Sequence, residues 1–225
     1  MIFFDIDATL LDHESAEKKG AIDFYKKYAD ELECSENELV DMWFELSKKY
    51  FEKFLSNELT FQEQRRFRIK DIFGYHLNDL QADNIFNNYL ILYKRNWSVF
   101  EDVVPCLVAL KQQGIRLGVI SNGNYQQQFE KLESVGIDHY FEHIFTSSEI
   151  GVAKPNPSIF QKACMQAKAQ LRKSIYVGDR LETDAIGSNK AGMVGVWLNR
   201  KKHKSNSGVK VIHSLLELTS IETER

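Results

Sequence analysis

Polar residues that could do chemistry follow three short apolar runs of this 225-residue chain, at residues 2–4, 117–120 and 175–178. Short apolar runs bounded by polar residues indicate buried strands. Because parallel strands end at one edge of a sheet, and ligands of open α/β sheets bind outside that edge, we expect the polar groups that follow to converge there. These groups are Asp5, Asp7, Ser121, Asp179 and Asp184.

The four carboxylates of this set would repel one another strongly in one cleft. A hard divalent cation with oxygen ligands relieves that repulsion, and Mg²⁺ binds through a few carboxylates while it keeps several waters. Ser121, the backbone N–H groups around Asn122 and Gly123, and the ammonium of Lys154 suit an anion instead. A cation held by acids beside an anion-binding cradle is typical of phosphoryl transfer.

Asp5 and Asp7 taken alone have a second interpretation. They could end a strand and enter a solvated turn in which Thr9 caps a helix. If the strand continues through both residues, alternation places their side chains on the same face of the sheet. Two close carboxylates either raise each other's pKa or share a cation. The hypothesis of a catalytic cleft therefore depends on the other strand ends.

Apolar strands alternate with helical patterns after Trp97. Such alternation predicts βαβ units and a mostly parallel, Rossmann-like sheet, so the fold class is α/β. The predicted strands cover residues 2–4, 117–121, 143–146, 174–178, 195–198 and the first part of 209–222. The predicted helices cover residues 101–113, 125–135, 157–169, 185–190 and the rest of 209–222.

The segment before Trp97 has helical patterns and no convincing strand. Ser35 with Glu38, and Thr60 with Glu63, fit the capping box that opens a helix. Asn78 fits an N-cap in the same way. Together with a first helix over about residues 14–32, these signals predict four helices.

The first strand is separated from the rest of the sheet by this helical block. Insertion into a strand-to-helix loop is tolerated because both ends of an insert can lie close together at the surface. We therefore predict an α/β core domain formed by residues 1–13 and 98–225, and an inserted four-helix domain formed by residues 14–97.

Composition excludes several classes of protein. The chain is 43% hydrophobic and 27% charged with a net charge of −3, so it has no nucleic-acid footprint. No stretch approaches the ~20 apolar residues of a membrane span. The three cysteines are far apart, which disfavours zinc and disulfides. A cleavable signal peptide would remove Asp5, so we expect a cytoplasmic protein, and we expect the basic loop 200–208 to be solvated.

Four segments of the chain together resemble the motifs of the haloacid dehalogenase (HAD) superfamily, in the family's order. They are Asp5-Ile-Asp-Ala-Thr, the strand end Ser121-Asn122, Lys154-Pro155, and Gly178-Asp-Arg-Leu-Glu-Thr-Asp184. The helical insert between the first two resembles the cap of subfamily I. The resemblance implies the HAD fold and a phosphatase that acts on a small phosphorylated metabolite, as a monomer or weak homodimer.

The resemblance also implies catalytic roles. Asp5 matches the nucleophile that forms an aspartyl-phosphate, which divides one hard displacement into two easier ones. Asp7 matches the general acid/base that protonates the leaving oxygen and then activates water. Lys154 matches the residue that stabilises charge on the transferring group.

Binding roles follow in the same way. Thr9 matches a residue that orients the first loop, and Ser121 with the Asn122 amide would bind the phosphoryl oxygens. Mg²⁺ would be held by Asp5, the main-chain carbonyl of Asp7, Asp179 and, through water, Asp184. Ala8 departs from the glycine usual in the family, and a Cβ there adds strain if the position needs a positive φ.

Rival functions remain open. A metal-independent 2-haloacid dehalogenase resembles the chain at the nucleophile but lacks the second acid of the first motif, so Asp7 favours a phosphatase. A phosphomutase of the subfamily keeps both acids, and a binding protein on an inactive HAD scaffold is the third class. Residues 59–68 resemble the cap of nucleotidases that hydrolyse nucleoside 5'-monophosphates.

Side chains of that cap segment have a structural interpretation as well. We expect its arginines to be solvated rather than to bind substrate, and we expect Trp43 and Phe67 to belong to the core of the insert rather than to stack on a base. The arginines are Arg65, Arg66 and Arg68.

Overall fold

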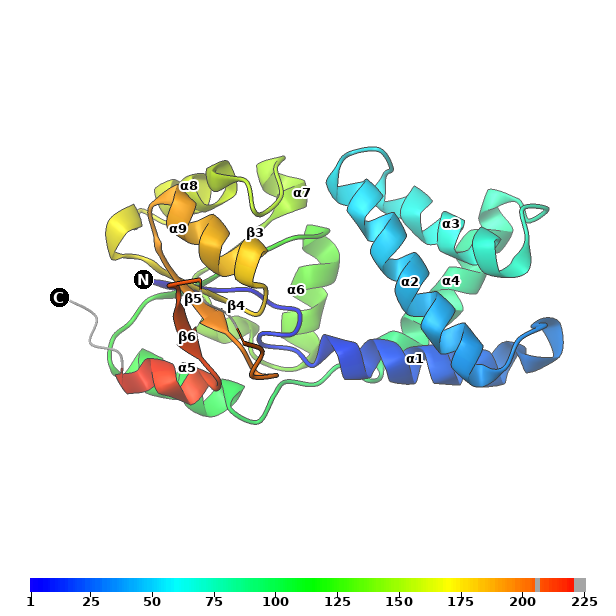
Figure 1. The fold of residues 1–225 in the computed structure, drawn as a ribbon, viewed down its shortest axis with the longest axis horizontal. Coiled ribbons are helices and arrows are strands. Elements are labelled where there is room, and N and C mark those ends of the chain that lie inside the picture. Colours follow the sequence, from blue (N-terminus) through cyan, green and yellow to red (C-terminus); the bar gives the residue numbers. More distant parts are fainter. Residues whose placement is uncertain (205–206, 221–225) are drawn as a thin grey trace. The chain divides into compact units, whose positions relative to one another are not determined.

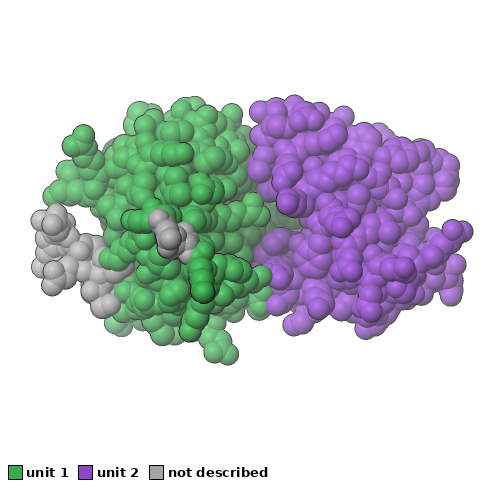
Figure 2. Space-filling view, viewed as in Figure 1, with its two compact units in different colours: residues 1–12, 98–225 green, residues 13–97 purple. Residues whose placement is uncertain are grey.

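The computed structural model describes residues 1–204 and 207–220 of the chain. The chain forms two compact units, one from Met1–Asp12 with Ser98–Arg225 and the other from His13–Trp97 (Figure 2). The first unit contains the sheet and the second is helical. His13, which the sequence places with the sheet, begins the first helix of the helical unit.

The sheet has six parallel strands among the described residues, in the order β3-β2-β1-β4-β5-β6 (Figure 1). This arrangement confirms the predicted α/β class. The strands are β1 (Ile2–Phe4), β2 (Leu117–Ser121), β3 (His143–Thr146), β4 (Ile175–Gly178), β5 (Val194–Leu198) and β6 (Lys210–Ile212).

Strand β1 pairs with β2 on one edge and with β4 on the other, so both of its edges are hydrogen-bonded within the sheet. Phe3 and Phe4 are fully buried, as expected for a parallel sheet with helices on both sides. Phe4 is in register with Val119 of β2 and Val177 of β4. The residues that follow these three strands therefore emerge side by side.

The helices of the sheet unit cover its two faces. In Figure 1, α5 and the C-terminal 3₁₀ helix lie on one side of the sheet, and α8 and α9 lie on the other. The α-helices are α5 (Val103–Gln112), α6 (Tyr125–Ser134), α7 (Ser147–Ile150), α8 (Pro157–Gln166) and α9 (Gly187–Ala191). The 3₁₀ helices are η2 (Asp138–Tyr140), η3 (Leu171–Lys173) and η5 (Leu215–Ser220).

Two of these elements differ from the prediction. The helix predicted over residues 185–190 begins earlier, as a π-helix (η4, Leu181–Ile186) that continues into α9. The final helix is the 3₁₀ helix η5, and residues 221–222 lie outside the described residues. A π-helix inside a helix is rare and occurs frequently at functional sites.

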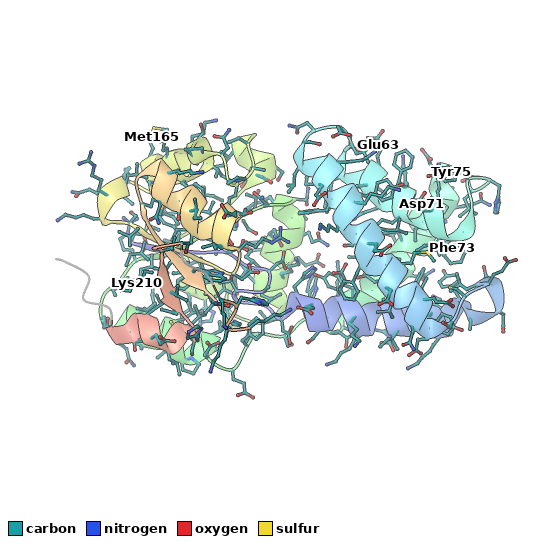
Figure 3. The ribbon with its side chains drawn as sticks, in the orientation of Figure 1. Glu63, Asp71, Phe73, Tyr75, Met165 and Lys210 are labelled. Atoms are coloured by element: carbon teal, nitrogen blue, oxygen red, sulfur yellow. The ribbon has the colours of Figure 1, made fainter. Side chains whose placement is uncertain are left out.

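The helical unit contains α1 (His13–Tyr28), η1 (Ala29–Glu31), α2 (Glu36–Leu55), α3 (Phe61–Phe73) and α4 (Asp79–Lys94). Ser35 forms the predicted capping box with Glu38, and Thr60 forms the other with Glu63. Glu63 is labelled in Figure 3. Asn78 caps α4. In the described part of the chain, no helix has the length and apolar character to cross a membrane.

The core of this unit is aromatic. Trp43 is fully buried, and its ring centroid lies 5.3 Å from that of Phe24, which confirms its expected place in the core. Phe67 stacks on Tyr50 with ring centroids 5.6 Å apart. These contacts give the unit a hydrophobic core of its own.

The expectation of solvated arginines is wrong for Arg68. This side chain is only 7% exposed, and Nη2 donates to the carbonyl of Ser47 at 3.4 Å. Burial lowers the pKa of Arg68, and the nearby carboxylate of Glu17 opposes that change. Arg66 also has partners, since it pairs with Asp79 and Asp83.

Candidate active site

The candidate site lies at the carboxyl edge of the sheet, where β1, β2 and β4 end. Asp5 directly follows β1, and its N–H donates to the carbonyl of Val177 at 2.9 Å, which extends the strand ladder by one bond. Ser121 ends β2 and Asp179 follows β4. The parallel register therefore brings these three predicted residues to one edge.

Lys154 lies at the centre of the charged groups. Its Nζ is 2.8 Å from Oδ1 of Asp5 and 2.8 Å from Oδ1 of Asp184. The ammonium also donates to the hydroxyl of Tyr176 at 2.7 Å. With 5% of its surface exposed, Lys154 is a buried cation whose partners include two carboxylates.

Asn122 positions this lysine through the backbone. The N–H of Lys154 donates to Oδ1 of Asn122 at 2.8 Å, and Nδ2 of Asn122 donates to the carbonyl of Lys154 at 3.1 Å. These reciprocal bonds join the end of β2 to the loop before α8. The side chain of Asn122 therefore holds the loop, which leaves its main-chain N–H as the group predicted to bind an anion.

Tyr176 is a site residue that the sequence analysis missed. Its hydroxyl donates to the carbonyl of Ile120 at 2.7 Å, and it is fully buried on β4. Burial, followed by the charges of Asp184 and Asp5, raises its pKa far above the usual range. The sequence did hold a signal for this residue, because Tyr176 lies inside an otherwise apolar strand. A buried tyrosine hydroxyl needs a hydrogen-bond partner, so polar groups had to lie nearby.

Three carboxylates form a compact cluster. Asp5, Asp179 and Asp184 each place one oxygen within 4.8 Å of the others. Burial, together with Asp184 and Asp5, raises the pKa of Asp179 to about 7. Burial also raises the pKa of Asp5, and Lys154 opposes that change.

This cluster fits a hard divalent cation. All its donors are oxygens, and its three carboxylates outnumber the ammonium of Lys154, which contacts Asp5 and Asp184. Burial alone would lower the pKa of Lys154, but Asp184 and Asp5 raise it. The lysine is therefore held charged and still leaves excess negative charge, which is the situation that Mg²⁺ relieves.

Local geometry explains how the segment after β4 supplies two of these acids, Asp179 and Asp184. A Cβ on Gly178 would lie 2.4 Å from Cγ of Asp184, so only glycine leaves room for that carboxylate. Oδ2 of Asp184 accepts from the N–H of Arg180 at 3.0 Å. Trp197 on β5 donates from Nε1 to the carbonyl of Asp179 at 2.7 Å. The π-helix η4 thus carries Asp184 back over the strand end.

Asp7 does not join the three-carboxylate cluster through its side chain. Its Oδ1 lies 2.6 Å from Nζ of Lys131, and its Oδ2 accepts from Nε2 of Gln128 at 3.2 Å. The two acids of the first motif therefore separate where β1 ends, and each has its own lysine. Both Lys131 and Gln128 belong to α6 and were not found from the sequence.

Ser121 and Thr9 have buried hydroxyls. Ser121 is 1% exposed, and its Oγ accepts from Nε2 of Gln128 at 2.9 Å. Thr9 is fully buried and its Oγ1 has no hydrogen-bond partner among the described residues. A fully buried Thr9 can shape the loop after β1, and its place among the binding residues stays a prediction.

The loop after β1 is supported from outside the predicted motifs. Arg200 donates from Nη2 to the carbonyl of Thr9 at 2.9 Å. Its two terminal nitrogens also bond both carboxylate oxygens of Asp102 at 2.9 Å. Arg200 therefore departs from the expectation that the basic loop 200–208 is solvated, because its side chain is only 20% exposed.

A model of the haloacid dehalogenase-like hydrolase family matches residues 2–198, a stretch that holds all the strand ends of the site. The chain belongs to that family. This match confirms the family that the four motifs predicted. The HAD assignment covers the helical unit as well as the sheet, because residues 13–97 lie inside the matched range.

Curated relatives of this HAD hydrolase are phosphatases. Glyceraldehyde 3-phosphate phosphatase from Methanothermobacter thermautotrophicus is 30% identical over 98% of this chain and 98% of its own length. N-acylneuraminate-9-phosphatase from Rattus norvegicus is 30% identical over 88% of this chain and 82% of its own. The Methanopyrus kandleri glyceraldehyde 3-phosphate phosphatase is 43% identical, but this chain spans 45% of it. The predicted enzyme class, phosphoric monoester hydrolase, is confirmed.

Solved structures show the same fold. The HAD-hydrolase YfnB from Bacillus subtilis, bound to magnesium, has a TM-score of 0.77 at 19% identity and covers 96% of this chain and 95% of its own. A 2-haloacid dehalogenase from Pseudomonas syringae has a TM-score of 0.70 at 24% identity and covers 96% of this chain and 95% of its own. The fold is therefore common to hydrolases with different reactions, and the site must separate them.

Proposed function

We propose that this HAD hydrolase cleaves a small phosphorylated metabolite by Mg²⁺-dependent hydrolysis through an aspartyl-phosphate on Asp5. One observation carries the proposal: Asp5 lies in the three-carboxylate cluster with one oxygen on Lys154, while Asp7, two residues later, lies outside it. Two acids that are so close in sequence and have different partners can take different roles.

In the first step, a carboxylate oxygen of Asp5 attacks phosphorus and the bond from phosphorus to the ester oxygen breaks. The electron pair of that bond goes to the leaving oxygen, which takes a proton from Asp7. Lys154 stabilises negative charge on the transferring group, and the Ser121 hydroxyl with the Asn122 N–H binds its oxygens. Donors fixed in advance around developing charge are usually the largest contribution to such catalysis.

In the second step, Asp7 acts as the base. It takes a proton from a water molecule whose oxygen attacks the phosphorus of the aspartyl-phosphate. The bond from phosphorus to the Asp5 oxygen breaks, its electron pair returns to the carboxylate, and inorganic phosphate leaves. One side chain thus gives a proton and then regains one, which general acid–base catalysis requires over a full cycle.

Asp5 and Asp179 would hold Mg²⁺ through their side chains and Asp184 would hold it through water, and the main-chain carbonyl of Asp7 would complete the set that the family resemblance implies. When bound, the metal offsets charge on the phosphoryl group and orients it. Without it, the excess of carboxylates at the strand ends would repel the anionic substrate.

Asp7 also separates this proposal from dehalogenation. Displacing a halide needs no protonated leaving group, whereas expelling an alkoxide does. The side chain of Asp7 is 29% exposed, so water and a leaving group can reach it. A phosphomutase would use the same residues and return the phosphoryl group to a second hydroxyl of the substrate.

The names of the relatives suggest which substrates to test. We propose a phosphorylated aldehyde or sugar-like metabolite, as glyceraldehyde 3-phosphate phosphatase and N-acylneuraminate-9-phosphatase are named for such compounds. The panel also includes nucleoside 5'-monophosphates and phosphoglycolate. Products are analysed for isomerised phosphate as well as free phosphate, which tests the mutase alternative.

The deciding experiment measures hydrolysis of this panel and of p-nitrophenyl phosphate, with a 2-haloacid as a control. We expect activity with Mg²⁺ that disappears in excess chelator, and a loss above about 10³-fold in Asp5→Asn. Borohydride applied to acid-quenched enzyme should reduce an acyl phosphate at Asp5 to an alcohol that mass spectrometry locates. Halide release, or full activity in chelator, would contradict the proposal.

A further inference from the structure

Helix α6 places two buried polar side chains against the candidate site. Gln128 and Lys131 are each 3% exposed, and they share a face of the helix with the fully buried Leu132. Residues three and four apart lie on the same face of a helix. Amides and lysines rarely occupy the buried face of a helix unless they are paired.

The Lys131 ammonium holds both oxygens of Asp7. Its Nζ donates to Oδ1 at 2.6 Å and to Oδ2 at 2.9 Å. The lysine side chain is 4% exposed and that of Asp7 is 29% exposed, so the cation is the more buried partner. Desolvating an ammonium is costly unless its partner is well placed, and this pair therefore fixes the direction of the Asp7 carboxylate.

Gln128 joins Asp7 to the end of β2. Its Nε2 lies 2.9 Å from Oγ of Ser121, 3.1 Å from the carbonyl of Asn122 and 3.2 Å from Oδ2 of Asp7. A Cβ on Gly123 would lie 3.3 Å from Nε2 of Gln128, which is a tight contact, so the glycine leaves room for the Gln128 amide. One side chain thus sets the spacing between the acid and the hydroxyl proposed to bind the phosphoryl group.

We propose that Lys131 and Gln128 are positioning residues that hold Asp7 as the base of the second step, hydrolysis of the aspartyl-phosphate. An ionised carboxylate is an acceptor only and can take the proton of the attacking water. Asp7 is in this form after it has given its proton to the leaving oxygen in the first step, and an ammonium bonded to both of its oxygens holds the carboxylate in one orientation. The inference rests on the proposed function, because it assigns further residues to the same reaction.

The inference predicts different effects on the two steps. With p-nitrophenyl phosphate the leaving group needs little help from a proton, so phosphorylation of Asp5 should not depend on how Asp7 is held. Hydrolysis of the intermediate should slow when Asp7 loses its support. Since kcat/KM reports the steps up to phosphorylation and kcat includes hydrolysis, the two quantities should separate.

The test measures steady-state and rapid-mixing kinetics of Lys131→Met. We expect kcat to fall about 10-fold, less than the 10²–10⁴-fold contribution of a whole general base. We expect kcat/KM to stay within about twofold and a burst near one p-nitrophenol per enzyme to appear. Lys111→Met, an exposed lysine on α5, is the matched control and should show none of these changes.

Three further variants keep the test decisive. Lys131→Arg retains a cation that can pair with a carboxylate and should recover most of kcat. Gln128→Met should give a smaller effect in the same direction. Lys131→Met combined with Asp7→Asn should be no slower in hydrolysis than Asp7→Asn alone. Circular dichroism melts of each variant check that it is folded.

The outcomes distinguish this inference from the function on which it rests. A parallel fall of kcat and kcat/KM in folded Lys131→Met, or kinetics like those of Lys111→Met, would overturn the positioning role while leaving the phosphatase intact. Wild-type enzyme that hydrolyses no phosphate ester, or an active Asp5→Asn variant, would overturn the proposed function itself.

Discussion

Ala8 lies between the two acids of the first loop with φ at +59°. This is the left-handed region, in which a Cβ costs an L-residue about 1–2 kcal/mol. Replacement by glycine removes that strain but adds freedom to the unfolded chain, worth about 0.4–1 kcal/mol. We therefore expect Ala8→Gly to raise the free energy of unfolding by about 0.5–1 kcal/mol, measured by chemical denaturation.

Ala109 in α5 provides the comparison for this substitution. It lies inside a helix, so Ala109→Gly should lower the free energy of unfolding by about 1 kcal/mol. Equal losses in both variants would show that the φ of Ala8 is not a strained one.

Asp179 should make stability depend on pH. Its pKa is about 7 in the folded protein, because of burial and the carboxylates of Asp184 and Asp5, against an ordinary value of 3.8. A carboxyl whose pKa rises on folding stabilises the folded state fully below its unfolded value and loses that contribution as the pH rises through the folded value. In metal-free buffer, the free energy of unfolding should fall between about pH 4 and 7, by up to about 1.4 kcal/mol per pH unit.

Urea titrations across that pH range measure the effect. Asp179→Asn should flatten the slope, and the exposed Asp30→Asn should leave it unchanged. The raised pKa of Asp5 adds a contribution of the same sign, so some slope should remain in Asp179→Asn. A stability that rises with pH in the wild-type protein over this window would contradict the assignment.

At the scale of elements, Arg200 joins four segments. Besides Asp102 and the carbonyl of Thr9, it packs over the ring of Phe100 at 4.0 Å. Asp102 also accepts from the N–H of Leu215 at 2.7 Å, which brings in the start of η5. The loop after β1 is thus tied to the segments around α5, η5 and the end of β5.

Removing the guanidinium of Arg200 should therefore destabilise the folded protein. Arg200→Met keeps the apolar stem of the side chain but removes the charge partner of Asp102, whose side chain is only 11% exposed. Because this leaves a largely buried carboxylate unpaired, we expect the free energy of unfolding to fall by about 3 kcal/mol. Arg116→Met is the control, because its pair with Glu142 is 42% and 36% exposed and should contribute less than about 1 kcal/mol.

The pH dependence of this pair has the opposite sign to that of Asp179. Burial would raise the pKa of Asp102, but Arg200, the Leu215 N–H and the Ser214 hydroxyl together lower it. A lowered pKa gives stability that is present above the unfolded value and is lost as the pH falls through the folded one. Lowering the pH below about 4 should therefore reduce the free energy of unfolding more in the wild-type protein than in Arg200→Met. Urea titrations at several pH values measure this difference.

Elements whose signal is local could be predicted from the sequence. The strand ends at Asp5, Ser121 and Asp179 followed from apolar runs that stop abruptly, and the capping boxes at Ser35 and Thr60 needed only neighbours in the chain. Because a parallel sheet aligns its strand ends, these local signals were enough to bring the acids together.

Residues whose partners are distant in sequence could not be predicted. Lys131 pairs with Asp7 and Arg200 pairs with Asp102, each far away along the chain. In the sequence both look like ordinary solvated cations, and only the tertiary packing buries them. Arg68 was misjudged for the same reason, since its burial depends on the packing of other helices.

At the scale of the whole molecule, the residues of the candidate site come from segments that span most of the chain. Asp5 is near the start, Ser121 and Lys154 are in the middle, and Asp184 follows the fourth strand. The helical unit is inserted between the first and second of these. The sheet therefore assembles a site that no single continuous stretch of the sequence contains.

The central place of β1 has a consequence for synthesis. Asp5 is translated well before the two strands that flank β1, which begin at Leu117 and Ile175. Until β4 emerges, the nascent chain carries an apolar segment with unpaired edges, a form of chain that chaperones commonly hold. Such long-range pairing also slows folding. The proposed nucleophile is thus translated before Ser121, Lys154 and Asp184, so a chain terminated ahead of these residues would carry Asp5 without the groups that surround it in the folded site.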